Sequence, residues 1–166
     1  MHSSPARGLP PSPIACGLAA LVIVVYLPAL GCDFIYDDFL VIHSRSVPTG
    51  LSEWISIFTT RQADNLPYYR PLTWLTIDVQ TAWHGHWAMA FHAVNVLLAA
   101  CFVASVFWLL LARCLRLSWP LATVGASAAA LHPVAACTVY PVSSGRETLL
   151  AAVAITLAVA AWLRSD

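Results

Sequence analysis

The chain contains no lysine, and charged residues make up only 10% of its 166 residues, with a formal net charge of zero. A soluble domain carries about 25% charged residues. Because no broad basic surface is available, nucleic acid is not expected as a partner. Hydrophobic residues make up 60% of the chain and the mean hydropathy is +0.75. This composition predicts an integral membrane protein that is in contact with the lipid bilayer.

Several catalytic and metal-binding motifs are also missing. The sequence has no CxxC, HExxH or Gly-x-Ser-x-Gly motif and no glycine-rich phosphate loop, which argues against the common zinc, serine-hydrolase and nucleotide-binding functions. Its cysteines lie singly in or beside apolar runs, where a thiol behaves as a small hydrophobic group. They indicate neither a metal site nor a disulfide framework, and no cofactor is predicted: Cys16, Cys32, Cys101, Cys114 and Cys137.

What the sequence does contain is a set of apolar runs close to the length of about 20 residues that a membrane-spanning helix needs. They predict an all-α membrane protein with about four spans, at residues 14–31, 88–112, 119–140 and 148–163. The first run is preceded by one arginine, as a signal peptide would be. Its core is long and lacks a small-x-small cleavage site, so we interpret it as a retained span.

Two local signals refine the later spans. Pro133 interrupts the third run and predicts a kink or an early helix end, because proline removes a backbone donor. The S-x-x-E pattern from Ser144 to Glu147 resembles a capping box, which would start the fourth helix ahead of residue 148.

Arginine placement predicts the topology, since short cytoplasmic loops keep an excess of positive charge. Arg7, Arg113, Arg116 and Arg164 lie in alternate connections. The cytoplasmic segments are therefore expected at 1–13, 113–118 and 164–166, and the lumenal or periplasmic segments at 32–87 and 141–147.

The long outer segment 32–87 is expected to be ordered, because aromatic and apolar residues recur along it. Four apolar residues at i, i+3, i+4 and i+7 predict a short amphipathic helix on the membrane surface or on the bundle: Leu51, Trp54, Ile55 and Phe58. Three tryptophans suit the interfacial belt before the second span: Trp74, Trp83 and Trp87. The segment's charged residues are Asp33, Asp37, Asp38, Glu53, Asp64, Asp78, Arg45, Arg61 and Arg70.

Asp37 and Asp38 are the clearest candidates for chemistry. Two adjacent carboxylates beside aromatic residues at a bilayer surface repel one another and are partly desolvated, which favours proton abstraction by one of them. A general base is one interpretation of the pair. The other is a solvated acidic turn that helps to keep the segment outside.

Arg70 follows Tyr69 near the point where the outer segment returns to the membrane. A guanidinium pinned before a proline is suited to bidentate contact with a phosphate. Alternatively, Arg70 pairs with an aspartate of the same segment or extends to lipid headgroups.

Polar residues also occur within or at the ends of the predicted spans. His92 and Asn95 lie one turn apart, and such residues more often form hydrogen bonds between helices than bind ligands. His132 and Arg146 are expected at the same membrane face as the acidic segment, where ionisable residues suggest a functional site. Glu147 has the capping box as a structural explanation.

In order and spacing, five motifs resemble one family, the transmembrane O-mannosyltransferases with tetratricopeptide repeats and their bacterial relatives, within the C-type (GT-C) glycosyltransferase superfamily. None of the repeats occurs here, and the resemblance covers the N-terminal part of such a protein, at about residues 20–163. The motifs are Phe34-Ile35-Tyr36-Asp37-Asp38, Tyr69-Arg70-Pro71-Leu72-Thr73, Phe91-His92-x-x-Asn95, Leu131-His132-Pro133 and Gly145-Arg146-Glu147.

The resemblance implies a glycosyltransferase that moves a mannose-like sugar, with inversion, from a polyprenyl-phosphate carrier to a protein or glycan hydroxyl. The lipid-linked sugar phosphate is then a co-substrate. Asp37 is implied as the base and Asp38 as its partner. Arg70, with Tyr69, His132 and Arg146, is implied to bind the phosphate.

In the same framework His92, Asn95 and Glu147 support the site, and this part of the enzyme is expected to be inactive alone. The competing interpretation is a non-catalytic scaffold or pseudoenzyme of the same fold. Because all basic residues except histidine are arginine, a bacterial inner membrane is favoured over the endoplasmic reticulum.

Overall fold

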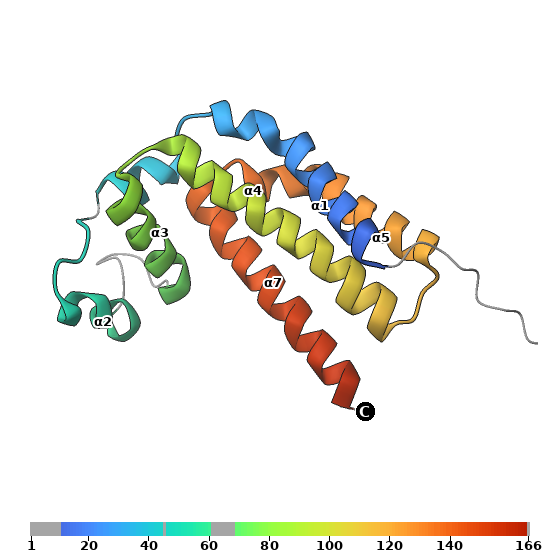
Figure 1. Cartoon of the computed structure of the whole chain (residues 1–166). Helices are drawn as coiled ribbons and strands as arrows, with labels where there is room; N and C mark the ends of the chain where they lie inside the picture. Colours follow the sequence, from blue (N-terminus) through green and yellow to red (C-terminus); the bar gives the residue numbers. More distant parts are fainter. Residues whose placement is uncertain (1–10, 45, 61–68, 166) are drawn as a thin grey trace, which may run out of the picture.

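The computed structural model describes residues 11–44, 46–60 and 69–165, and within these ranges every regular element is a helix (Figure 1). Predictions for Arg7, Arg45, Arg61 and Asp64 fall outside the described residues, as do those for the side chains of Arg113 and Arg164. In chain order the elements are α1 (Pro11–Tyr26), η1 (Leu27–Gly31), η2 (Phe39–His43), α2 (Leu51–Thr59), α3 (Pro71–His84), α4 (Ala88–Ser105), η3 (Val106–Cys114), α5 (Trp119–Leu131), α6 (Pro133–Val139) and α7 (Val142–Ser165).

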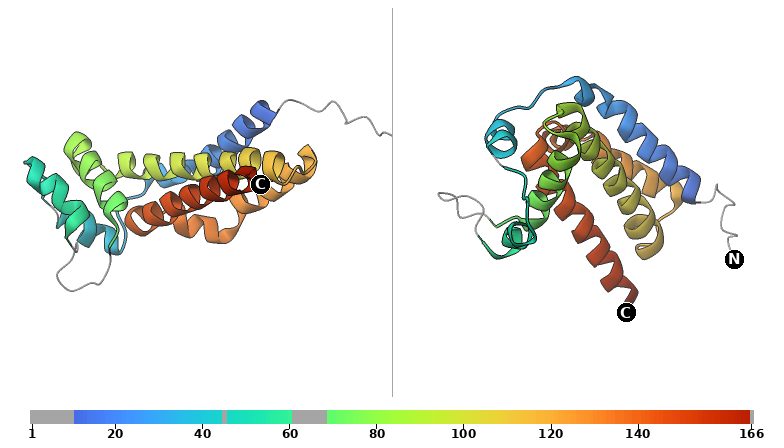
Figure 2. Two further views of the ribbon diagram at one scale, coloured as in Figure 1. Left: turned by 90° about the horizontal axis from the view of Figure 1, so that it is seen from below. Right: turned by 60° about the vertical axis from the view of Figure 1, so that its left-hand side comes forward.

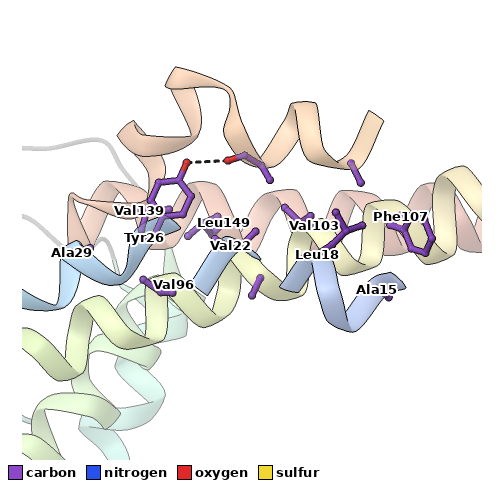
Figure 3. Packing of buried hydrophobic residues seen from close by; sticks show 14 of the residues in the cluster. Ala15, Leu18, Val22, Tyr26, Ala29, Val96, Val103, Phe107, Val139 and Leu149 are labelled. Carbon is purple, nitrogen blue, oxygen red and sulfur yellow. Dashed lines mark hydrogen bonds between the residues drawn. The ribbon is translucent and has the colours of Figure 1, made fainter. Parts of the chain in front are cut away.

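Helix α4 is the centre of the bundle. It packs along α1 on one side and α7 on the other, and it also contacts α5 and α6 (Figure 1). The interfaces contain many buried alanines, which let helix backbones approach closely in a membrane protein. Figure 3 shows this core, in which the Tyr26 hydroxyl donates a hydrogen bond to the Ala130 carbonyl, 3.0 Å away, and so joins α1 to α5.

Three helices are long and apolar enough to cross a membrane: Ser12–Gly31, Ala88–Leu109 and Val142–Leu163. They support a multi-pass membrane protein and confirm apolar helices in three of the four predicted regions. The first combines α1 with the 3-10 turn η1, and the second runs from α4 into the π-helical segment η3.

The third predicted span is broken, as Pro133 indicated. Helices α5 and α6 meet at an angle of 59°. The two helices are long and apolar enough to cross a membrane only if they are counted together as one span. The residue before a proline avoids the helical conformation, and His132 is extended, with ψ at 134°. Its imidazole Nδ1 accepts a hydrogen bond from the Val134 amide, which caps α6.

The fourth helix begins at Val142, which confirms a start ahead of residue 148, and most of the predicted outer connection 141–147 is helical. The capping box is wrong, because Ser144 and Glu147 both lie inside the helix. The first amides of α7 are capped instead by Asp38. This contact places the start of α7 at the same end of the bundle as the outer segment. Helices α5 and α6 therefore connect opposite ends (Figure 2).

Helix α2 lies where the short amphipathic helix is predicted, but most of the predicted apolar face is exposed. Leu51, Ile55 and Phe58 are exposed, and Ile57 is the buried residue of α2. The position of this helix, on the membrane surface or on the bundle, stays a prediction.

Helix α3 was not expected, although its boundaries have typical signals. Pro71 occupies a first-turn position, where proline is preferred, and Gly85 follows the last turn with a φ of +59°. Much of the buried face of α3 is polar, with Thr73, Gln80 and Thr81 among its members. A search for apolar periodicity misses such a helix.

The topology can be tested by labelling single cysteines in a chain that lacks the native ones. Thr60 and Leu115 are exposed and lie toward opposite ends of the bundle. With four crossings, a membrane-impermeant maleimide should modify Thr60→Cys from outside and Leu115→Cys only after permeabilisation. Modification of Leu115→Cys from outside would contradict the arrangement.

Candidate functional site

Asp38 binds the N-terminus of α7 through a buried carboxylate. Its oxygens accept hydrogen bonds from the Val142 amide at 2.9 Å and from both the amide and the hydroxyl of Ser143 at 2.8 Å. The side chain is 1% exposed. A carboxylate here also interacts favourably with the helix dipole, and bonds to an ionised acceptor are stronger than neutral ones. Asp38 therefore holds the outer segment on α7.

Asp37, by contrast, is exposed. Tyr36 precedes it with a φ of +48°, in the left-handed region that non-glycine residues rarely adopt, and with a side chain that is 88% exposed. Such strain persists only where neighbouring contacts enforce it. On either side of Tyr36, Phe34 and Asp38 are buried. The structure thus separates the acidic pair into a buried helix cap and an accessible carboxylate.

Arg146 lies one turn further along α7 and has no exposed surface. Its guanidinium donates to the side-chain oxygens of Asn95 at 2.9 Å and Gln80 at 2.8 Å, and to the Phe91 carbonyl at 3.0 Å. These bonds join α7 to α3 and α4. In this conformation Arg146 holds helices together, and its contact with a donor phosphate stays a prediction.

Asn95 confirms the expected role of a hydrogen-bonding residue between helices. Besides accepting from Arg146, its amide donates to the Pro141 carbonyl at 3.0 Å and the Val142 carbonyl at 3.2 Å. His92 is equally buried but less well paired. Its Nε2 lies 3.4 Å from the Asp33 carbonyl, and Nδ1 has no hydrogen-bond partner among the described residues.

The network depends on close approach between α6 and α7. A Cβ atom at Gly145 would lie 2.3 Å from the Thr138 carbonyl oxygen and 3.1 Å from the Asn95 amide nitrogen. The first distance is far below van der Waals contact, and backbone cannot move aside as a flexible side chain can. Glycine is therefore required beside Arg146.

Arg70 and Glu147 form an ion pair between the start of α3 and the second turn of α7. The pair stands at one end of an open groove of about 680 Å³. From the pair the groove continues along α7, where its lining is apolar, with Leu150, Ala151 and Ile155 among its residues. Arg70, paired with Glu147, thus lies at the head of an apolar groove, where an arginine could bind the anionic head of an amphiphile.

One face of α7 connects this groove to the acidic pair. Ser143, which binds Asp38, and Glu147, which binds Arg70, are four residues apart and therefore neighbours on the same face of the helix. With a rise of about 1.5 Å per residue, the two contacts are about 6 Å apart along the axis. Through Ser143 and Glu147, α7 therefore contacts both Asp38 and Arg70.

Two predicted site residues lie elsewhere. The Tyr69 hydroxyl donates to the Phe58 carbonyl at 2.7 Å and so holds α2, although Tyr69 directly precedes Arg70. His132 lines a second, apolar cavity of about 260 Å³ between α1, α4, α5, α6 and α7. The geometry does not place His132 beside Arg70.

Sequence reasoning missed Gln80 and Ser143. Gln80 belongs to a buried face of α3 that continues from Thr73 and Ile77 at i, i+4 and i+7. Helical spacing of mixed polar and apolar residues was the available signal. No sequence signal pointed to Ser143, because its partner Asp38 is 105 residues away in the chain.

Replacing Gly145 by alanine should destabilise the bundle by about 1–3 kcal/mol, the usual cost of overpacking. The new methyl group would force α7 away from Thr138 and stretch the bonds of Arg146. Gly17→Ala is the matched control, since no atom lies within 4 Å of its added Cβ, and it should be neutral or stabilising. Thermal unfolding in detergent, followed by circular dichroism, measures both. Equal melting temperatures for the two variants would contradict the close approach.

Replacing Asp38 by alanine should cost about 1–3 kcal/mol, because the amides of Val142 and Ser143 lose their acceptors while still buried. Amide hydrogen exchange should then accelerate at the start of α7. Asp37→Ala is the control for the same loss of charge and should leave exchange at Val142 unchanged. Unaltered exchange in Asp38→Ala would show that the cap is dispensable.

Comparison of the chain with known protein families, with curated proteins and with solved structures finds no match. A functional proposal therefore has to be supported by the geometry and by the motifs quoted above.

Proposed function

We propose that the chain forms the acceptor base and part of the donor site of a membrane-embedded glycosyltransferase. The enzyme moves a mannose-like sugar from a polyprenyl-phosphate carrier to a protein or glycan hydroxyl. The bacterial inner membrane is its proposed location.

The observation that supports this function most is the shared face of α7. It holds an exposed carboxylate segment and, one turn away, an arginine at the head of an apolar groove. A polyprenyl phosphate has an anionic head and a long apolar tail, which match Arg70 and the wall that ends near Ile155. The groove would hold the beginning of the tail, and the bilayer would hold the rest.

In the proposed reaction Asp37 accepts the proton of the acceptor hydroxyl, whose oxygen attacks the anomeric carbon of the sugar. The bond between that carbon and the phosphate oxygen breaks, and polyprenyl phosphate leaves with the electron pair. Because this is a single displacement, the configuration inverts. Arg70 stabilises the charge that develops on the phosphate. Asp38 keeps the segment in position, since its own carboxylate is occupied by α7.

Changing Asp37 to asparagine should lower sugar transfer by about 10²–10⁴-fold, the usual contribution of a positioned general base. The variant is best introduced at the natural locus, and transfer from polyprenyl-phosphate mannose is then measured in isolated membranes. Asp33→Asn, at an exposed aspartate of the same segment, is the matched control and should transfer normally.

Normal transfer by Asp37→Asn would remove the proposed base. Absence of any transfer by the unaltered protein, with a range of polyprenyl-phosphate sugars, would favour the non-catalytic scaffold instead.

A further inference from the structure

The ion pair at the head of the groove has an unusual position. The side chains of Arg70 and Glu147 are 38% and 28% exposed, and both residues line the groove. Arg70 directly precedes α3, whereas Glu147 lies on α7, so the pair spans the groove at its polar end. Any anion that approaches Arg70 there meets the carboxylate of Glu147 already in place.

Among the described residues, Arg70 is the one side-chain partner of Glu147. The capping role that its position in the sequence suggested belongs to Asp38. The interaction that the structure gives it is the ion pair with Arg70. A carboxylate and a phosphate present similar pairs of oxygens to a guanidinium, so each can replace the other.

We propose that Glu147 is a placeholder for the donor phosphate: it neutralises Arg70 in the unliganded protein and is displaced when a polyprenyl phosphate enters the groove. The identity of this ligand rests on the proposed function. In this exchange one anionic partner of Arg70 replaces another. It also makes Glu147 a competitor that sets the affinity for the lipid.

The alternative is that Glu147 orients Arg70 for the phosphate, and the two roles predict opposite signs. Removing a competitor strengthens lipid binding, whereas removing a positioning residue weakens it. Since both side chains are partly solvated, the ion pair is modest and the change should be roughly two- to fivefold.

The test measures binding of undecaprenyl phosphate to the 166-residue chain in nanodiscs of phosphatidylcholine. Glu147→Gln should lower the dissociation constant roughly two- to fivefold. Arg70→Ala should weaken binding strongly, and adding Glu147→Gln to it should have no further effect, because the competition needs the guanidinium. Undecaprenol, which lacks the phosphate, should bind the unaltered chain and Glu147→Gln with equal affinity.

Glu53→Gln is the matched control. Glu53 is an exposed glutamate of α2 that accepts a hydrogen bond from the Thr49 amide, so its replacement removes the same charge away from the groove. Its affinity for undecaprenyl phosphate should match that of the unaltered chain. An equal fall in the dissociation constant for Glu53→Gln would show that the change in net charge causes the effect. That result would overturn the proposal. Circular dichroism melts should show that each variant is folded.

Unchanged or weaker binding by Glu147→Gln would also overturn the placeholder role, even where sugar transfer is established. Conversely, tighter binding by Glu147→Gln in a protein that transfers no sugar would retain the placeholder and remove the proposed enzyme. The two proposals can therefore fail separately.

Discussion

The contact between Asp38 and the start of α7 organises the end of the bundle that carries residues 32–87. A helix begins with backbone amides that have no partner within the helix. At α7 these amides are buried, so an acceptor has to be supplied by another segment. Asp38 supplies it from 104 residues away, and the same contact fixes the strained Tyr36 and the exposed Asp37 beside the helix.

Burial of Arg146 depends on the same arrangement. A charged group without exposed surface is tolerated only when polar groups surround it. Asn95, Gln80 and the Phe91 carbonyl do so from α4 and α3, and Asp38 adds electrostatic attraction. Removing one acceptor would leave a buried donor unpaired. The polar network is therefore a constraint on which α3, α4 and α7 all depend.

Much of the membrane architecture could be predicted from sequence, because apolar run length and Pro133 act locally. Helix α3 could not, since its buried face carries Thr73 and Gln80 in place of apolar residues. The residue types at the candidate site were recognisable, but their roles were not. Adjacent Asp37 and Asp38 look equivalent in sequence, and only tertiary contacts bury one and expose the other.

The arrangement on α7 has a mechanical consequence. Ser143 holds the acidic segment and Glu147 holds Arg70 from one face of one helix. A tilt or shift of α7 would therefore carry both contacts together and preserve their separation. An inverting displacement requires the base and the leaving phosphate to lie on opposite sides of the anomeric carbon, so their spacing has to be kept while substrates enter. Under the proposed function, a single rigid helix meets this requirement more directly than two independently moving loops would.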